Sequence, residues 1–467
     1  MLPNEEFSTF AALKDRFAKG ETRSEEFRRE QLNKLQRLIE EHRTEIEQAL
    51  AKDLRKSSFD AEISEIGVTL SEIRHAQKSL RRWMKPRCVS TPLLLQPARS
   101  RVRPEPVGVV LIISPWNYPL NLLFGPLVGA LAAGNCVVLK PSELAPATST
   151  LLTRLVNSTF AADVVRAVEG GREETTRLLA LPFDHIFFTG STEVGRVVMQ
   201  AAAKNLVPVT LELGGKSPCF VLSDADLKIS ARRIAWGKFL NVGQTCVAPD
   251  YVLVDAQKKA AFLEELSIAL REFWGQDPRT SPDYGRIINS KHYDRLVGLL
   301  NESLRSGART VVGGQTESVE RYIAPTVLDH VTWESPVMRE EIFGPLLPVI
   351  AFDTLEEAMA QVRNRPRPLA LYVFTDDETQ ERAVTEGLSF GGGCVNDTIV
   401  HLGNLNLPFG GIGASGMGAY HGDRSFEVFS HFKALLRRPF RFDVKVRYPP
   451  HSANKLKLVR WLRTIFG

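Results

Sequence analysis

One cysteine in the middle of this 467-residue chain stands where its thiol could act as a nucleophile. Cys246 follows the turn-forming stretch 241–243 and precedes Pro249 and an apolar run at 251–254. That run predicts a strand, so the cysteine would lie on a tight loop held by a rigid element, as catalytic side chains often do. Taken alone, such a cysteine is more often a small buried apolar residue than a nucleophile.

A carboxylate at the end of a predicted strand makes the nucleophile the favoured interpretation of Cys246. Glu212 lies in the apolar stretch 207–213, directly before two glycines. An acid there costs free energy unless it has a partner or a task. An acylated thiol needs a base that activates the water releasing the acyl group, and a carboxylate can serve. Glu212 and Cys246 together indicate covalent catalysis.

These two motifs carry a family resemblance. Residues 211–216 read LELGGK and residues 243–251 read GQTCVAPDY. The pair resembles the aldehyde dehydrogenase superfamily, and the longer string resembles its class 3 branch. The resemblance runs from the first helices to about residue 450. It implies an enzyme that oxidises aldehydes with NAD(P), with Cys246 as the nucleophile and Glu212 as the base.

A loop with a proline on each side supplies a third catalytic residue. Residues 114–119 read SPWNYP and close a predicted strand. The resemblance makes Asn117 the donor that, with the backbone N–H of Cys246, stabilises the oxyanion. Losing one such donor costs about 3–4 kcal/mol of transition-state stabilisation. The resemblance also implies a substrate pocket containing Tyr118, Asn396 and His421, although a lone histidine is more often structural.

A strand-to-helix turn is the expected phosphate site of the cofactor. Residues 188–195 read FTGSTEVG, and free N–H groups at a helix start can meet a phosphate. By itself a turn of this kind is more often plain architecture, but it looks like the family's nucleotide-contacting turn. The residues that this resemblance assigns to the phosphate and nearby parts of the cofactor site are Trp116, Gly190, Ser191, Gly195 and Leu213.

Two further motifs are assigned to the riboses. Lys140 and Glu143 end a strand, where the residues alone permit an ordinary helix cap. The resemblance places both on the adenosine ribose, where a carboxylate favours NAD over NADP. Because the class 3 branch uses both cofactors, we expect NAD to be preferred and NADP accepted. In EEIFGP, at 340–345, the resemblance assigns Glu341 to the nicotinamide ribose and Phe343 to the nicotinamide side.

The elements around these motifs predict an α/β fold. Amphipathic stretches at 26–50 and 60–83 indicate helices, and apolar strands alternate with helices from 107 onward. Continuous apolar strands of this kind form parallel sheets that are covered on both faces. With the resemblance, we expect two parallel-sheet α/β domains and a small β oligomerisation arm. The expected parts are an NAD(P)-binding Rossmann-type domain (1–85 and 105–210), a catalytic domain (211–425), the arm (86–104 and 426–450) and a basic amphipathic tail (451–467).

Composition excludes several other classes of protein. The chain has 59 basic and 54 acidic residues, and a dispersed net charge of +5 does not indicate nucleic-acid binding. Its five cysteines lie far apart without metal-ligand spacing, which indicates neither a zinc site nor a disulfide framework. The acidic N-terminal residues do not resemble a signal peptide. We therefore expect a cytoplasmic protein in a reducing compartment, with at most a peripheral membrane contact.

The C-terminal region predicts partners. Residues 435–447 alternate like a strand near their end, and in class 3 relatives a C-terminal strand joins the second subunit of a homodimer. Residues 455–466 place Leu458, Val459, Leu462, Ile465 and Phe466 at helical spacing among basic residues. This helix either docks over its own body, contacts anionic lipid weakly, or guards the substrate mouth.

Two functional alternatives remain open beside the oxidation of an aldehyde to an acid. A relative that transfers its acyl group to CoA is disfavoured by Glu212, which serves hydrolysis. A non-catalytic protein on the same scaffold is disfavoured because every expected catalytic residue is present. The class 3 likeness and the apolar tail favour apolar aldehydes, with aliphatic, aromatic and isoprenoid-type substrates all possible.

Overall fold

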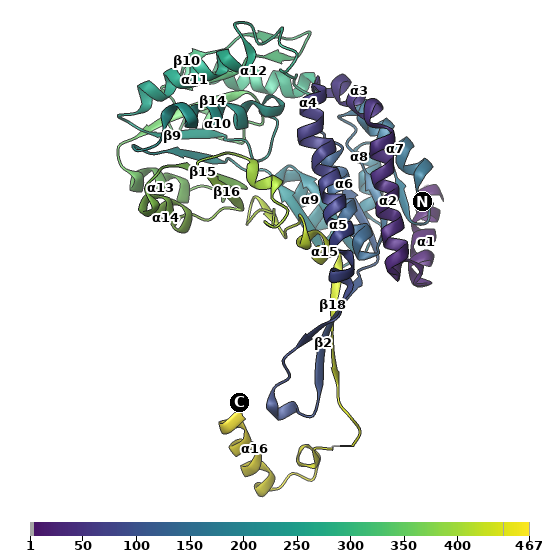
Figure 1. The fold of residues 1–467 in the computed structure, drawn as a ribbon. Helices are drawn as coiled ribbons and strands as arrows, with labels where there is room; N and C mark the ends of the chain where they lie inside the picture. The colour runs from purple at the N-terminus through teal and green to yellow at the C-terminus, as the bar shows by residue number, and fades with distance from the viewer. Residues whose placement is uncertain (1–3, 442, 467) are drawn as a thin grey trace.

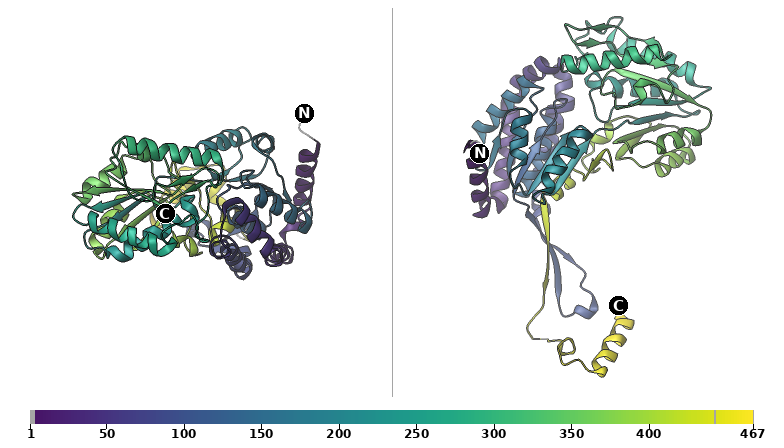
Figure 2. Two further views of the ribbon diagram at one scale, coloured as in Figure 1. Left: turned by 90° about the horizontal axis from the view of Figure 1, so that it is seen from above. Right: turned by 180° about the vertical axis from the view of Figure 1, so that it is seen from behind.

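Two α/β bodies and a thin β arm make up the molecule, seen in a computed structural model that describes residues 4–441 and 443–466 (Figure 1). The N-terminal helices pack on the first sheet, and the second sheet forms the neighbouring body. The arm leaves the first body and ends at the C-terminal helix (Figures 1 and 2). The predicted fold class is confirmed.

The N-terminal helices differ in detail from the sequence pattern. The stretch 26–50, expected as one helical segment, is divided at His42 into α2 (Glu25–Glu41) and α3 (Arg43–Leu54). The second stretch begins with α4 (Ser58–Ala61), passes through a π-helical turn, η2 (Glu62–Ile66), and continues as α5 (Gly67–Met84). The extra residue of a π turn shifts the buried face of a helix, and such turns are frequent at functional sites. The first helix is α1 (Asn4–Ala18).

The first sheet is six-stranded, in the order β17-β7-β6-β3-β4-β5. Its five longer strands are parallel, and β17 pairs antiparallel with β7 at one edge. Strands β3 and β4 are buried along their whole length, as their continuous apolar runs predict. The strands are β3 (Val109–Ile113), β4 (Cys136–Lys140), β5 (Val165–Ala167), β6 (His185–Gly190), β7 (Val209–Leu213) and β17 (Gly416–Met417). The helices that follow β3 to β6 are α6 (Asn121–Ala133), α7 (Pro146–Thr159), α8 (Arg172–Leu179) and α9 (Thr192–Ala203).

The second sheet has seven strands, in the order β10-β13-β14-β9-β8-β15-β16. It is parallel except for β10, which pairs antiparallel with β13. The strands are β8 (Pro218–Val221), β9 (Tyr251–Asp255), β10 (Arg309–Val312), β13 (Thr326–Asp329), β14 (Leu346–Phe352), β15 (Ala370–Phe374) and β16 (Gly392–Val395). The helices of this body are α10 (Leu227–Phe239), α11 (Lys259–Trp274), α12 (Ser290–Arg305), α13 (Leu355–Arg363) and α14 (Glu378–Gly387). Helix α15 (Asp423–Val428) instead packs on α6 of the first body.

The arm is a three-stranded antiparallel sheet. Strand β2 (Arg99–Pro106) lies between β1 (Arg87–Val89) and β18 (Ser430–Arg437). The strand expected near residues 443–447 is wrong, because β18 ends at Arg437 opposite the first residue of β2. The chain then meets Pro439, which has no N–H for a ladder, and Lys445–Arg447 forms a 3₁₀ turn.

The C-terminal helix α16 (Ala453–Phe466) lies beside the short turn η3 (Leu93–Leu95) at the tip of the arm (Figures 1 and 2). It does not dock over either α/β body, so that interpretation of the tail is wrong. Most of its described apolar side chains, including Leu458 and Trp461, are exposed, whereas Leu462 is half-buried. The side chains of Ile465 and Phe466 lie outside the described residues. None of the helices in the described part of the chain combines the length and the apolar composition that a membrane span requires.

Candidate active site

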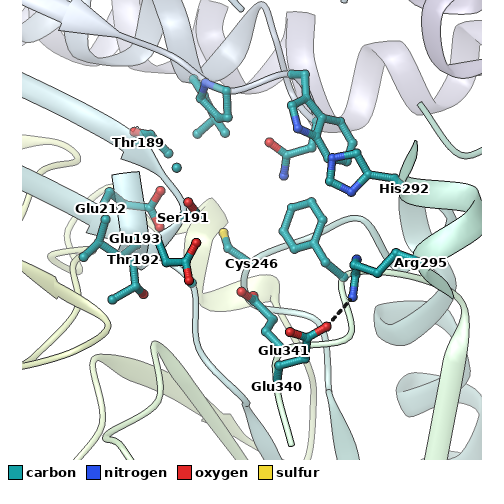
Figure 3. Close-up of a pocket in the computed structure, with 18 residues that line it drawn as sticks. Thr189, Ser191, Thr192, Glu193, Glu212, Cys246, His292, Arg295, Glu340 and Glu341 are labelled. Carbon is teal, nitrogen blue, oxygen red and sulfur yellow. Dashed lines mark hydrogen bonds and ion pairs between the residues drawn. The ribbon is translucent and has the colours of Figure 1, made fainter. Parts of the chain in front are cut away.

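A pocket of about 420 Å³ lies where the carboxyl ends of β3, β6 and β7 meet loops of the second body (Figure 3). Ligands of open α/β sheets bind outside these strand ends. The structure brings together nine of the predicted residues in its wall, which are Trp116, Asn117, Gly190, Ser191, Glu212, Leu213, Cys246, Glu341 and Phe343.

The loop before Cys246 has an unusual backbone. Three consecutive residues, Asn241, Val242 and Gly243, have positive φ angles of 51°, 59° and 74°. A β-branched residue such as Val242 rarely adopts this conformation, and such strain persists only where the surroundings fix it. A Cβ on Gly243 would lie 2.3 Å from the Gly344 carbonyl oxygen, so this turn requires glycine. The strained turn holds Cys246 at the pocket.

Asn117 is fixed against that loop. Its Nδ2 donates to the Gln244 carbonyl at 3.0 Å, and the Asn241 amide donates back to the Asn117 carbonyl at 2.9 Å. The Asn117 side chain is buried, and its Oδ1 has no hydrogen-bond partner among the described residues. Because a primary amide carries two N–H groups, one remains for a ligand beside Cys246.

Glu212 and Cys246 share an environment that disfavours charge. Neither carboxylate oxygen of Glu212 accepts a hydrogen bond from an N–H or O–H group of the described residues. Burial raises the pKa of Glu212 to about 8, against a smaller lowering by the Cys246 thiol. Burial, and then the carboxylates of Glu212 and Glu341, raise the pKa of Cys246 well above its usual range. Of the two expected routes to the thiolate, lowering of the thiol pKa by the site is therefore not what the structure shows.

The start of α9 forms another wall of the pocket. Ser191 caps this helix by accepting from the Val194 N–H at 3.4 Å. The hydroxyl of Thr189, two residues earlier in the chain, is buried without a partner among the described residues. Gly195 lies off the pocket wall, and a Cβ there would approach Leu213 to 2.7 Å. Its role is to let α9 pack closely on β7.

Glu341, from the loop before β14, lies below Cys246 in the view of Figure 3. Burial raises its pKa to about 8, and its Oε1 has no hydrogen-bond partner among the described residues. Lys216 holds this loop in place, since its ammonium donates to Asp250 at 2.6 Å and to the Glu340 carbonyl at 2.9 Å.

Lys140 and Glu143 lie outside the pocket wall, at the end of β4, which neighbours β3. The Lys140 ammonium is buried and donates to the Pro141 carbonyl at 2.7 Å, while the Glu143 carboxylate lies 3.5 Å away and is half exposed. A long ligand that follows the strand ends from the pocket would reach them.

The three residues predicted for the substrate do not line this pocket. Tyr118 is buried and shares a 2.6 Å hydrogen bond with Thr245, next to Cys246. Asn396 uses both ends of its amide on the backbone of Thr375. His421 is buried with its ring 5.2 Å from that of Phe409, and burial lowers its pKa to about 4.

Two further residues of the pocket wall, His292 and Arg295, belong to no motif recognised in the sequence. His292 and Arg295 come from one face of α12, and the His292 ring lies 5.0 Å from that of Trp116. Arg295 donates to Glu340 at 3.1 Å (Figure 3). Only the helical i, i+3 spacing relates the two residues in the sequence, and that spacing does not point to the pocket.

Comparisons with known proteins identify the family. The family model described as "Aldehyde dehydrogenase family" matches residues 8–435. The 4,4'-diaponeurosporen-aldehyde dehydrogenase of Staphylococcus aureus is 50% identical over 95% of this chain and 96% of its own. Aldehyde dehydrogenase family 3 member B1 of Bos taurus is 49% identical over 97% of this chain and 96% of its own. The solved structure "Substrate bound state of Staphylococcus Aureus AldH" covers 99% of this chain and 100% of its own at 49% identity, with a TM-score of 0.96. The chain is an enzyme that belongs to the aldehyde dehydrogenase family, with class 3 relatives among its matches.

Proposed function

We propose that this enzyme oxidises apolar aldehydes to carboxylic acids with NAD(P), through a thioester on Cys246. The observation that carries the proposal is the arrangement at one end of the pocket. The Cys246 thiol lines the same pocket as the Glu212 carboxylate, which lacks an N–H or O–H donor among the described residues, and as the Asn117 amide, which has a free N–H.

The residues divide the reaction between them. Glu212 accepts the thiol proton as the sulfur of Cys246 bonds to the aldehyde carbon, and the carbonyl oxygen becomes negative. The amide of Asn117 and the backbone N–H of Cys246 stabilise that oxygen. Bound NAD(P) supplies the acceptor for the hydride that the carbon loses. After Glu212 has released the thiol proton to solvent, it takes a proton from water, whose oxygen bonds to the thioester carbon. The carbon–sulfur bond then breaks, so the carboxylic acid departs and Cys246 is left as a thiolate.

The residues present fit a dinucleotide. The partnerless carboxylate oxygen of Glu341, the hydroxyl of Thr189 and the start of α9 line one pocket, and Lys140 and Glu143 lie one strand further along the same sheet edge. Hydroxyls of a ribose can satisfy the carboxylates, and N–H groups at the start of α9 can meet a phosphate. The exposed carboxylate of Glu143 would repel a 2'-phosphate, so NAD is preferred and NADP accepted.

An apolar substrate is supported by a second hollow of about 330 Å³. Its wall includes Asn241 and Val242 of the nucleophile loop, and most of its other residues are apolar or aromatic. The S. aureus relative, whose name specifies 4,4'-diaponeurosporen-aldehyde, supports the isoprenoid end of the substrate range. The aromatic and apolar wall residues are Phe59, Trp236, Phe239, Leu240, Phe273 and Trp274.

The test is the formation of reduced cofactor from NAD and a chain-length series of aldehydes. We expect steady turnover in the wild type, none in Cys246→Ala, and an accumulating acyl-enzyme in Glu212→Gln, detected by mass spectrometry. Wild-type activity in Cys246→Ala would refute the mechanism. Stimulation of turnover by added CoA would favour the acyl-transferring alternative, and inactivity of folded protein with every aldehyde would favour the non-catalytic one.

The assembly and location belong to the same proposal. The arm exposes Leu435 and Leu436 on β18 and the leucines of η3, an apolar surface that supports a homodimer built through the arm. The exposed leucines and basic residues of α16 support a weak contact with an anionic membrane surface. All five cysteines are free thiols, which supports a cytoplasmic, reducing location.

A further inference from the structure

A buried ion pair lies directly behind the loop that carries Asn117. Lys56 follows α3, and Glu65 lies in the π-helical turn η2. The Lys56 ammonium donates to Glu65 Oε1 at 2.6 Å, and the two side chains are only 2% and 0% exposed. Neither residue belongs to a motif of the family resemblance.

Lys56 holds the Asn117 end of the loop. Its ammonium also donates to the backbone carbonyl of Asn117 at 3.0 Å and lies 4.0 Å from the centre of the Tyr118 ring. The Asn241 amide donates to the same carbonyl, so this peptide oxygen receives hydrogen bonds from two sides. One of them comes from the nucleophile loop and the other from the ion pair.

Glu65 holds the other end of the loop. Its second oxygen accepts from the backbone N–H groups of Leu120 at 3.1 Å and Asn121 at 3.0 Å, where α6 begins. The ion pair therefore forms hydrogen bonds with both ends of the short segment from Asn117 to the start of α6. The π turn brings the Glu65 carboxylate to this position.

Stability alone is a weak reason for such a pair. Burial raises the pKa of Glu65 and lowers that of Lys56, while the opposite charge of each partner acts against both shifts. Replacing a buried ion pair with apolar side chains is often neutral or stabilising. Here both charged groups form hydrogen bonds with the backbone of the segment that carries the Asn117 amide, at Asn117 and at Leu120.

We infer that Lys56 and Glu65 form a positioning pair that fixes the Asn117 amide relative to Cys246. The inference rests on the proposed function, in which this amide stabilises the oxyanion. Lys56 contributes to the wall of the second hollow, but its ammonium is turned to Glu65 and to the Asn117 carbonyl, and Glu65 lines neither hollow. Both charged groups therefore act through Asn117. A misplacement of about 1 Å in a reacting geometry can cost about 100-fold in rate.

The test replaces the pair by neutral groups of similar size, as Lys56→Met with Glu65→Gln, which leaves no uncompensated charge. We expect kcat/KM for the aldehyde to fall roughly 10- to 100-fold. The Kd of NAD, read from tryptophan fluorescence, should stay unchanged because the NAD-facing walls keep their contacts. In an Asn117→Ala background the same double replacement should change kcat/KM less than 2-fold, because the side-chain amide that the pair positions is absent.

A matched control separates positioning from stability. Arg28 is a buried cation that donates to backbone carbonyls of Thr22 and Ala132, outside the pocket wall. Arg28→Met should lower Tm without changing kcat/KM. The inference would be overturned if the double variant Lys56→Met, Glu65→Gln kept the wild-type kcat/KM. It would also be overturned if the double replacement lowered kcat/KM equally in the wild type and in Asn117→Ala, or if the double variant failed to fold. Inactivity of the wild type with every aldehyde would instead refute the proposed function.

Discussion

The side-chain amide of Asn117 donates to the backbone carbonyl of Gln244 over 3.0 Å and so joins two loops that lie 127 residues apart in the chain. The contact fixes the amide beside Cys246 while one of its N–H groups stays available. An oxyanion donor needs this arrangement, because a group that is already oriented pays no reorganisation cost when the negative charge develops.

Replacing Asn117 by Ala should lower kcat for aldehyde oxidation about 100- to 1000-fold, the usual loss for one oxyanion donor. Alkylation of Cys246 by iodoacetamide should change much less, because that reaction forms no oxyanion. Steady-state kinetics and mass spectrometry of the alkylated protein give the two rates. Equal losses in both reactions would mean that the variant has displaced Cys246, and an unchanged kcat would remove Asn117 from the mechanism.

Hydrolysis of the acyl-enzyme should depend on pH through Glu212. The pKa of this carboxyl is raised to about 8 by burial, and a general base must be ionised. The rate of single-turnover hydrolysis should therefore rise about tenfold per pH unit below 8 and level off above it. The dependence should vanish in Glu212→Gln, which hydrolyses slowly at every pH. A flat wild-type profile between pH 6 and 9 would contradict the role.

The same carboxyl should make stability fall as pH rises. Its pKa is 4.5 as an ordinary side chain and about 8 in the folded protein. Between these values the folded state keeps a proton that the unfolded state releases, so the unfolding free energy decreases with pH until about 8. Glu212→Gln should therefore gain stability over the wild type from pH 5 to 8, by on the order of a few kcal/mol.

Thermal unfolding at several pH values measures this gain. Glu378→Gln, at a site whose side chain is 84% exposed, controls for the loss of one negative charge and should track the wild type. A constant difference in Tm between Glu212→Gln and the wild type across pH 5–8 would show that the folded protein does not perturb this carboxyl.

Much of the first α/β body could be predicted from the sequence because its signals are local. The apolar runs at 109–113 and 136–140 coincide with β3 and β4, and a parallel sheet brings the ends of its strands to one edge. Motifs at those ends, such as Asn117 and Glu212, therefore meet in one pocket.

Features that depend on distant contacts were not predictable in this way. Arg295 lines the pocket and forms an ion pair with Glu340, 45 residues away. The side-chain amide of Asn396 is held by hydrogen bonds with the backbone N–H and carbonyl of Thr375. The strand expected near residue 445 failed because its partner, β2, begins at Arg99 and offers no further pairing. Such outcomes are decided by tertiary pairing and not by local pattern.

The C-terminal helix should bind anionic membranes. Leu458 and Trp461 of α16 are exposed, and its basic residues would face lipid headgroups. In liposome flotation with anionic lipid, the full chain should float in part. A variant truncated after Pro450 should stay in the soluble fraction, and so should Leu458→Glu with Trp461→Glu, which keeps the helix length. High salt should weaken flotation, since exposed charges are screened. Equal behaviour of all three proteins would refute lipid binding. A mass difference between full and truncated protein in sedimentation would then assign the helix to the subunit interface.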